Sequence, residues 1–171
     1  MKNIAVLGTK PHGHWFPIVS WLIRLLEWTK QSHVLLYFPE THMVRHAHFN
    51  NIKEQHIDEF MKDNRMMDMK VISFPDEAYD KVDLYSKYRL GKQKGYFKTL
   101  FGSIIPQLCK HIFKTRFKNP WYEGTTCSEF VRESLAQGDE VEVSILTKHI
   151  PKGTFTTWEA LCLASHLSDK Y

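Results

Sequence analysis

The sequence predicts an α+β fold, with a single domain over residues 1–171 in which a small antiparallel sheet packs against helices. Short apolar segments that end at turn residues alternate with longer segments of helical spacing. Hydrophobic residues make up 43% of the chain and charged residues 25%, which is typical of a folded protein. Because no repeat or linker divides the chain, we expect one core, which a chain of this length can build without disulfides.

Short apolar or alternating segments predict the strands. They lie at Asn3–Leu7, His33–Phe38, Met43–His48, Met69–Phe74 and over the alternation Val141, Val143, Ile145. The turn Pro39–His42 is expected to join the second and third strands into a hairpin. After the first strand, Gly8 is expected to open a loop that contains Pro11 and Gly13.

Helical spacing predicts the remaining elements. Helices are expected from near Pro17 to Trp28, then at Ile52–Asn64, Asp76–Leu90, Tyr96–Leu108, Thr125–Ala136 and Thr157–Leu167. The first of these is apolar on two sides and is expected to be buried on both, with Trp21 and Trp28 widening the face of Leu25. Pro106 is expected to break the fourth helix.

The net charge of +4 is small, and the basic residues are most concentrated in one stretch: Lys110, Lys114, Arg116 and Lys118, interleaved with His111, Phe113 and Phe117. We interpret this stretch as a solvated face, and the alternative is contact with phosphates or lipid head groups at a membrane surface. Nucleic-acid binding is not expected, because its usual signature is a stronger basic excess within a recognisable module.

Three cysteines stand far apart without a CxxC pair, which indicates reduced thiols and a reducing, cytoplasmic compartment. The apolar run Ile4–Leu7 is too short for the core of a secretion signal. Arg24 interrupts the longest apolar stretch, Trp15–Trp28, which is too short for a transmembrane segment. The sequence therefore predicts neither a cleaved leader nor a membrane span.

Cys127 stands at the start of a predicted helix. Thr126 and Glu129 have the spacing of a capping box, in which each side chain satisfies an end amide of the helix. In the first helical turn, unpaired amides and the positive end of the helix dipole stabilise a thiolate. The pattern predicts a thiol nucleophile, and the alternative is a small packed side chain, which is our interpretation of Cys109 and Cys162.

A thiolate nucleophile needs a base, and His33 opens the strand that follows the long apolar helix. From the sheet edge its ring can project towards a helix N-terminus. Under period-two alternation, His42, His46 and His48 share one face of the next strand, so each is a candidate to orient the His33 ring.

An oxyanion that forms during attack on a carbonyl needs hydrogen-bond donors. The backbone N–H of Cys127, at the helix start, is a natural donor. Thr126 and Tyr122 complete the predicted oxyanion and substrate-binding set, with Tyr122 as a hydroxyl donor or, alternatively, a packed aromatic side chain.

Three blocks occur in an order that resembles a known group. They are Ser20–Arg24 continuing through Gln31–Tyr37, then Val44–Ala47, then Thr126–Val131. Together they resemble the permuted papain-like cysteine hydrolases of the NlpC-type amidase and peptidase superfamily, to which lecithin:retinol acyltransferase is related. In this group the histidine block precedes the cysteine block, as it does here.

The resemblance implies a permuted papain-like fold with the nucleophile at a helix N-terminus and with no cofactor. It implies Cys127 as nucleophile, His33 as general base and acid, and His46 as the residue that orients His33. The expected reaction is hydrolysis of an amide or peptide-type bond through an acyl-enzyme on Cys127, with a small-molecule, peptide or acyl substrate.

Three alternatives stay open at the level of sequence. The same residues could transfer an acyl group or hydrolyse a thioester on a lipid. His42, His46 and His48 could instead bind zinc, with Cys127 contributing from a distance, although no HExxH or CxxC element accompanies them. The third alternative is a binding module that keeps the fold without the chemistry.

Overall fold

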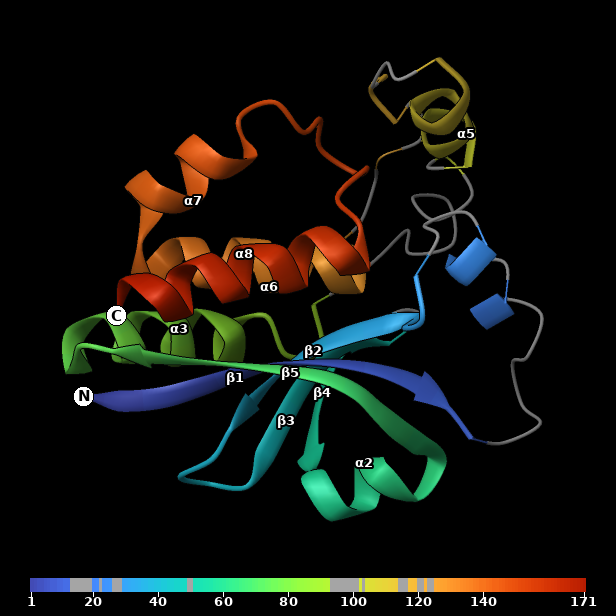
Figure 1. Cartoon of the computed structure of the whole chain (residues 1–171). Helices are drawn as coiled ribbons and strands as arrows, with labels where there is room; N and C mark the ends of the chain where they lie inside the picture. The colour runs from blue at the N-terminus through green and yellow to red at the C-terminus, as the bar shows by residue number, and fades with distance from the viewer. Residues whose placement is uncertain are drawn as a thin grey trace.

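The structure is a computed structural model of the chain. It describes residues 1–12, 20–21, 23–25, 29–48, 51–92, 102, 104–113, 117–119, 122 and 125–171. The strands of this part form one antiparallel sheet in the order β4-β3-β2-β1-β5 (Figure 1). They are β1 (Lys2–Pro11), β2 (His33–Phe38), β3 (Met43–His48), β4 (Asn51–His56) and β5 (Asn64–Phe74).

Helices fill most of the remaining described chain. They are α2 (Ile57–Asp63), α3 (Asp76–Tyr88), α5 (Ile104–Phe113), α6 (Cys127–Gly138), α7 (Glu140–Thr147) and α8 (Thr157–Lys170). The predicted α+β class, with an antiparallel sheet packed against helices, is confirmed. No helix within the described residues is long and apolar enough to cross a membrane.

Helices lie on both faces of the sheet (Figure 1), and a separate apolar cluster lies on each face. α3, α6 and α8 pack against one face, where alternate residues such as Val34 and Leu36 of β2 join the larger cluster. α2 covers the other face, where Leu35 of β2 and Val44 of β3 pack with Phe60 of α2. Because side chains alternate along a strand, β1, β2 and β3 contribute to both clusters, whereas Ile52 of β4 and Ile72 and Phe74 of β5 join the larger cluster.

The predicted hairpin is confirmed, with β2 and β3 at the expected residues and His42 at φ 55° in the turn. β1 does not end at Leu7 as predicted. It continues through Gly8, which pairs with Val34, and on to Pro11, with a shift of register against β5 after Gly8. β5 likewise begins at Asn64 rather than at Met69.

Two predicted elements are of the wrong type. Ile52–Asn64 is not one helix but β4 followed by α2, since the segment pairs with β3 and His56 then caps α2 by accepting a hydrogen bond from the backbone N–H of Asp58. The predicted strand at Val141–Ile145 is helix α7, which Asp139 caps. A short alternating run is compatible with either structure, and the cap and packing decide between them.

The predicted helices at Asp76–Leu90 and Thr157–Leu167 correspond to α3 and α8. α5 is not broken by Pro106 but continues to Phe113, and the prediction before residue 102 falls outside the described residues.

Residues 20–21 and 23–25 are helical, whereas the start near Pro17 lies outside the described part. Trp21 and Leu25 are 56% and 52% exposed, so the expectation that this helix is buried on two sides is wrong for them.

Candidate functional site

The start of α6 holds the candidate nucleophile. Cys127 is the first residue of α6, is 4% exposed and packs in the larger apolar cluster beneath the helices. Thr126 is the N-cap, and its hydroxyl accepts a hydrogen bond from the backbone N–H of Glu129 at 3.3 Å. The side chain predicted to bind substrate therefore has a structural role in this conformation.

The second half of the predicted capping box is not formed. The carboxylate of Glu129 accepts a hydrogen bond from the backbone N–H of Gly153 at 2.7 Å and pairs with Arg132 at 2.5 Å. Burial raises the pKa of Glu129, and the Arg132 charge opposes that rise. Glu129 thus attaches the segment before α8 to the start of α6. A complete capping box is instead present at Thr156 and Glu159 of α8.

Further contacts hold the start of α6 from both sides. Ser128 donates a hydrogen bond to the carbonyl oxygen of Phe155. Arg89, at the end of α3, donates to the hydroxyl of Thr125 at 2.6 Å and pairs with Glu133 at 2.6 Å. Sequence reasoning missed Arg89, since residues 36 apart along the chain meet here only through tertiary packing.

The other two cysteines differ in their surroundings. None of the three cysteines forms a disulfide; Cys109 is partly buried and Cys162 is exposed. The interpretation of Cys162 as a packed side chain is therefore wrong. Cys127 is the buried member of the set, and it is the one that begins a helix.

Two histidines of neighbouring strands lie in direct contact. Nε2 of His33 and Nδ1 of His46 are 3.2 Å apart, and the rings meet edge to face with centroids 5.3 Å apart. Of the three candidates to orient His33, His46 is the one in hydrogen-bond contact with it. His42 lies in the hairpin turn, where Nδ1 is 3.2 Å from the hydroxyl of Tyr37, and the His48 ring stacks edge to face on His46.

The histidine pair lies on the α2 side of the sheet. The Phe60 ring of α2 is 6.4 Å from the His33 ring and 5.1 Å from the His46 ring between centroids. Val34, the next residue of β2, points to the opposite side and joins the cluster that contains Cys127. The structure therefore brings His33 and His46 together on the face of the sheet opposite the cluster that contains Cys127.

Both rings are uncharged at neutral pH. Burial lowers the pKa of His33 from 6.5 to about 4, and the charge of His48 adds to the effect. Burial also lowers the pKa of His46 to about 2, with further contributions from His33, His48 and Lys53. Nε2 of His46 is buried without a hydrogen-bond partner. A neutral imidazole is the form that accepts a proton from a thiol, but a pKa this far below neutrality makes each ring a weaker base than an ordinary histidine.

The histidine pair predicts a loss of stability in acid. Because His33 titrates near 6.5 when unfolded and near 4 when folded, the unfolded state binds more protons between these values. The free energy of unfolding should therefore fall as the pH drops from 6.5 to 4, by about 2–3 kcal/mol from His33 alone. Urea unfolding at several pH values would measure this. His33→Gln should weaken the pH dependence, and an identical dependence in that variant would contradict the assignment.

Tyr122 packs beside the segment that Glu129 holds. Burial raises the pKa of Tyr122 to about 12, together with the charges of Glu133 and Glu129, so the phenol keeps its proton at neutral pH. Gly153 has φ +78°, and a Cβ there would lie 2.6 Å from the Tyr122 ring. Tyr122 is therefore a packed aromatic side chain whose hydroxyl remains a donor.

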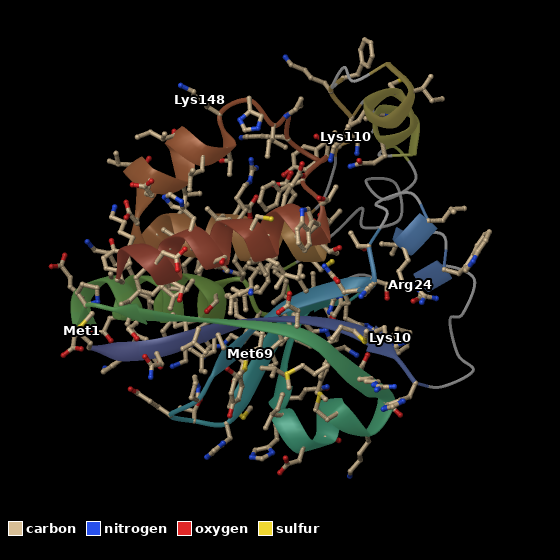
Figure 2. The ribbon with its side chains drawn as sticks, viewed as in Figure 1. Met1, Lys10, Arg24, Met69, Lys110 and Lys148 are labelled. Carbon is tan, nitrogen blue, oxygen red and sulfur yellow. The ribbon has the colours of Figure 1, made fainter. Side chains whose placement is uncertain are left out.

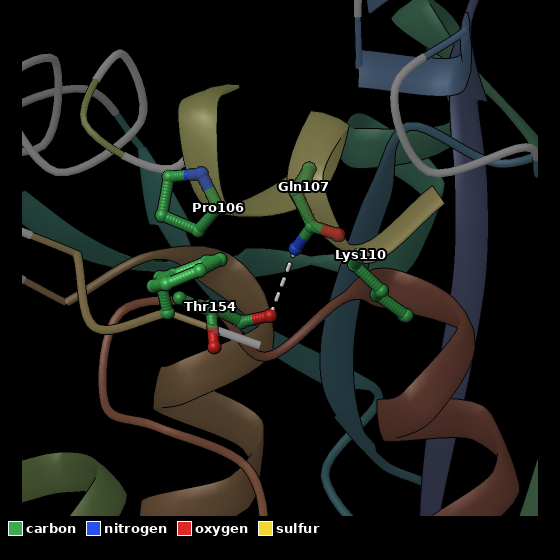
Figure 3. Close-up of a pocket in the computed structure, with 5 residues that line it drawn as sticks. Pro106, Gln107, Lys110 and Thr154 are labelled. Atoms are coloured by element: carbon green, nitrogen blue, oxygen red, sulfur yellow. Dashed lines mark hydrogen bonds between the residues drawn. The ribbon is translucent and has the colours of Figure 1, made fainter. Parts of the chain in front are cut away.

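A small pocket lies between α5 and the segment before α8. Its lining residues are Pro106, Gln107, Lys110, Phe117 and Thr154. Gln107 donates a hydrogen bond to the carbonyl oxygen of Thr154 at 2.9 Å (Figure 3). Lys110 extends from α5 (Figure 2) and pairs with Glu159 at 3.1 Å. Within the predicted basic stretch, Lys110 is thus neutralised, Lys118 is exposed, and Lys114 and Arg116 lie outside the described residues.

Metal binding gains no support from the geometry. Across the residues that the structure describes, no group of three or more His, Cys, Asp or Glu side chains is arranged to hold a metal ion. Among the histidines considered for zinc, His42 stacks near His56 at 6.0 Å between ring centroids, away from the His33–His46 pair.

The fold and the site together define an α+β chain with a buried thiol at a capped helix start and a neutral histidine pair on the sheet. Comparison of the chain with protein-family models, with curated proteins and with solved structures gives no match. The resemblance to the permuted papain-like hydrolases therefore stays a prediction, and the function is argued from the residues themselves.

Proposed function

We propose that this chain is a cysteine hydrolase of the permuted papain-like type, which cleaves an amide or peptide-type bond through an acyl-enzyme on Cys127. The observation that carries the proposal is the position of Cys127 as the first residue of a helix capped by Thr126. Unpaired amides at that position favour a thiolate and donate to an oxyanion. The helix packs across β2 and β3, the two strands that hold His33 and His46.

In the proposed reaction His33 takes up and gives back a proton twice, once in acylation and once in deacylation. Its ring takes the proton of the Cys127 thiol while sulfur attacks the substrate carbonyl, and the backbone N–H of Cys127 binds the oxyanion. The tetrahedral species collapses with loss of the amine, which receives the proton from His33. Water, deprotonated by His33, then attacks the thioester, and the carboxylic acid and the free thiol are released.

His46 has the orienting role in this mechanism. The contact between Nε2 of His33 and Nδ1 of His46 occupies one ring nitrogen and leaves Nδ1 of His33 for the thiol. Proton transfer requires Nδ1 to come within hydrogen-bond reach of the sulfur. Catalytic hydrogen bonds commonly tighten only when substrate is bound.

One observation favours a second candidate, a binding module that has lost the chemistry. The two imidazoles bond to each other and contact Phe60, on the face of the sheet opposite the cluster that contains Cys127. In that case the pair fills the space between the sheet and α2. Acyl transfer or thioester hydrolysis would use the same residues as the amide hydrolase, with a different acceptor or leaving group.

Covalent trapping with a set of small thiol-reactive acyl probes, followed by peptide mass spectrometry, tests the proposal. Labelling is expected at Cys127 despite its burial, and its rate should exceed that of the exposed thiol of Cys162. A Cys162→Ser chain removes the competing exposed thiol. Labelling confined to Cys109 and Cys162, with Cys127 slower than an ordinary thiol at every pH from 6 to 9, would exclude the hydrolase and leave the binding module.

A further inference from the structure

The outer edge of β5 is an open pairing surface. β5 runs for 11 residues at the end of the sheet and pairs with β1, and no other described strand pairs with it (Figure 1). Three apolar side chains along it are exposed: Met66 at 45%, Met69 at 47% and Val71 at 38%. A long apolar edge of this kind associates readily with a further strand.

The backbone of β5 shows which amides face outwards. The N–H of Met69 points away from β1 and donates to the carboxylate of Asp68 at 2.8 Å. A pairing strand would take this amide from Asp68 and release the carboxylate, which also lies 3.8 Å from Nζ of Lys70 in the same chain. In an antiparallel ladder, alternate residues direct both backbone groups to the same neighbour. Val71 and Ser73 therefore present their amides on the same open edge as Met69.

The side chains of β5 are complementary to those of a second β5 in one register. We propose that two copies of this chain form a dimer in which their β5 strands pair antiparallel about a twofold axis at Met69. Asp68 of each chain then lies opposite Lys70 of the other, and Met67 lies opposite Val71. A centre at Asp68 or at Lys70 would instead bring like charges together.

α8 covers the face of β5 opposite Met69 and Val71, which pair with Leu7 and Ala5 of the α2-side cluster. α8 packs on β5, and the exposed thiol of Cys162 lies close enough to Lys70 and Asp68 for their charges to act on its pKa. Trp158, one helical turn earlier, is 54% exposed and shares that side of α8. A twofold axis at Met69 (labelled in Figure 2) would bring two copies of this helix onto the same side of the joined sheet.

Charge variants test the register by sedimentation velocity over a range of concentrations. Wild type is expected to show a concentration-dependent dimer. Asp68→Lys places a lysine opposite the partner's Lys70 and should raise the dissociation constant about tenfold or more, because two attractive pairs become repulsive. The double change Asp68→Lys with Lys70→Asp exchanges the charges and should restore dissociation to near the wild-type value. Loss without restoration in the double variant would overturn the register.

A backbone variant tests strand pairing independently of charge. Val71→Pro removes an outward N–H without touching the bonds to β1, so it should abolish the dimer while the monomer stays folded. Val71→Thr keeps the N–H and the strand propensity and is the matched control. Amide exchange at Met69, Val71 and Ser73 should slow with rising concentration in wild type. A chain that stays monomeric at its solubility limit overturns the proposal, even if the edge binds an added peptide.

Discussion

Cys127→Ala is expected to reduce hydrolysis by about 10³-fold or more, because no acyl-enzyme forms without the sulfur nucleophile. The fold should survive, since the change removes a single buried atom and leaves Thr126, the cap of α6, in place. The measurement is kcat/KM for hydrolysis of an amide that carries the same acyl group as the probe that labels Cys127. Cys162→Ala is the matched control, because that thiol is exposed and lies in the interior of α8, and it should keep full activity.

The histidine variants refine the same expectation. His33→Gln should lower kcat by about 10²–10⁴-fold, which is the range for loss of a general base. His46→Gln can still hydrogen-bond to His33 and should cost less. If Cys127→Ala keeps wild-type activity, or if His33→Gln affects stability but not the rate, the proposed mechanism is wrong.

Arg45→Ala is expected to lower the free energy of unfolding by about 3–5 kcal/mol, because it removes a large buried side chain together with the charge that partly exposed carboxylates share. Arg45 is 1% exposed and lies on the face of β3 that α3, α6 and α8 cover. Its guanidinium pairs with Glu54 at 2.6 Å and with Asp83 at 2.7 Å, and donates to the hydroxyl of Ser86 at 2.6 Å. It also lies over the Phe38 ring at 4.1 Å, so packing is lost together with charge pairing.

Denaturant unfolding of purified variants measures this effect. Glu54→Gln is the matched control: Glu54 is 27% exposed, so removal of its charge alone should cost about 1 kcal/mol or less. Arg45→Met fills much of the volume without the charge and should fall between the two. An Arg45→Ala loss no larger than that of Glu54→Gln would show that Arg45 and its partners contribute little to stability.

Local patterns predicted the parts of the fold whose partners are adjacent in sequence. The hairpin of β2 and β3 needs only two apolar strands and the turn at Pro39–His42, and it is confirmed. By contrast, Asn51–His56 carries a single apolar residue, Ile52, and becomes β4 through its pairing with β3. Helix α7 was wrongly predicted as a strand from the alternation of Val141, Val143 and Ile145. In the structure Val143 is buried whereas Val141 and Ile145 are exposed, and alternation alone does not indicate this distribution.

The sequence by itself determined the start of α6, since the Thr126 cap and the cysteine after it are local features that depend on neighbouring amides. The choice of His46 as the partner of His33 came from the resemblance alone, because period-two alternation left His42, His46 and His48 as equal candidates; the structure puts His46 in contact with His33. Only the tertiary structure decided which side of the sheet these rings occupy. That choice depends on where α2 and α6 pack, and these helices come from segments distant along the chain from β2. Arg89 reaches Thr125, and Glu129 reaches Gly153, through the same long-range packing.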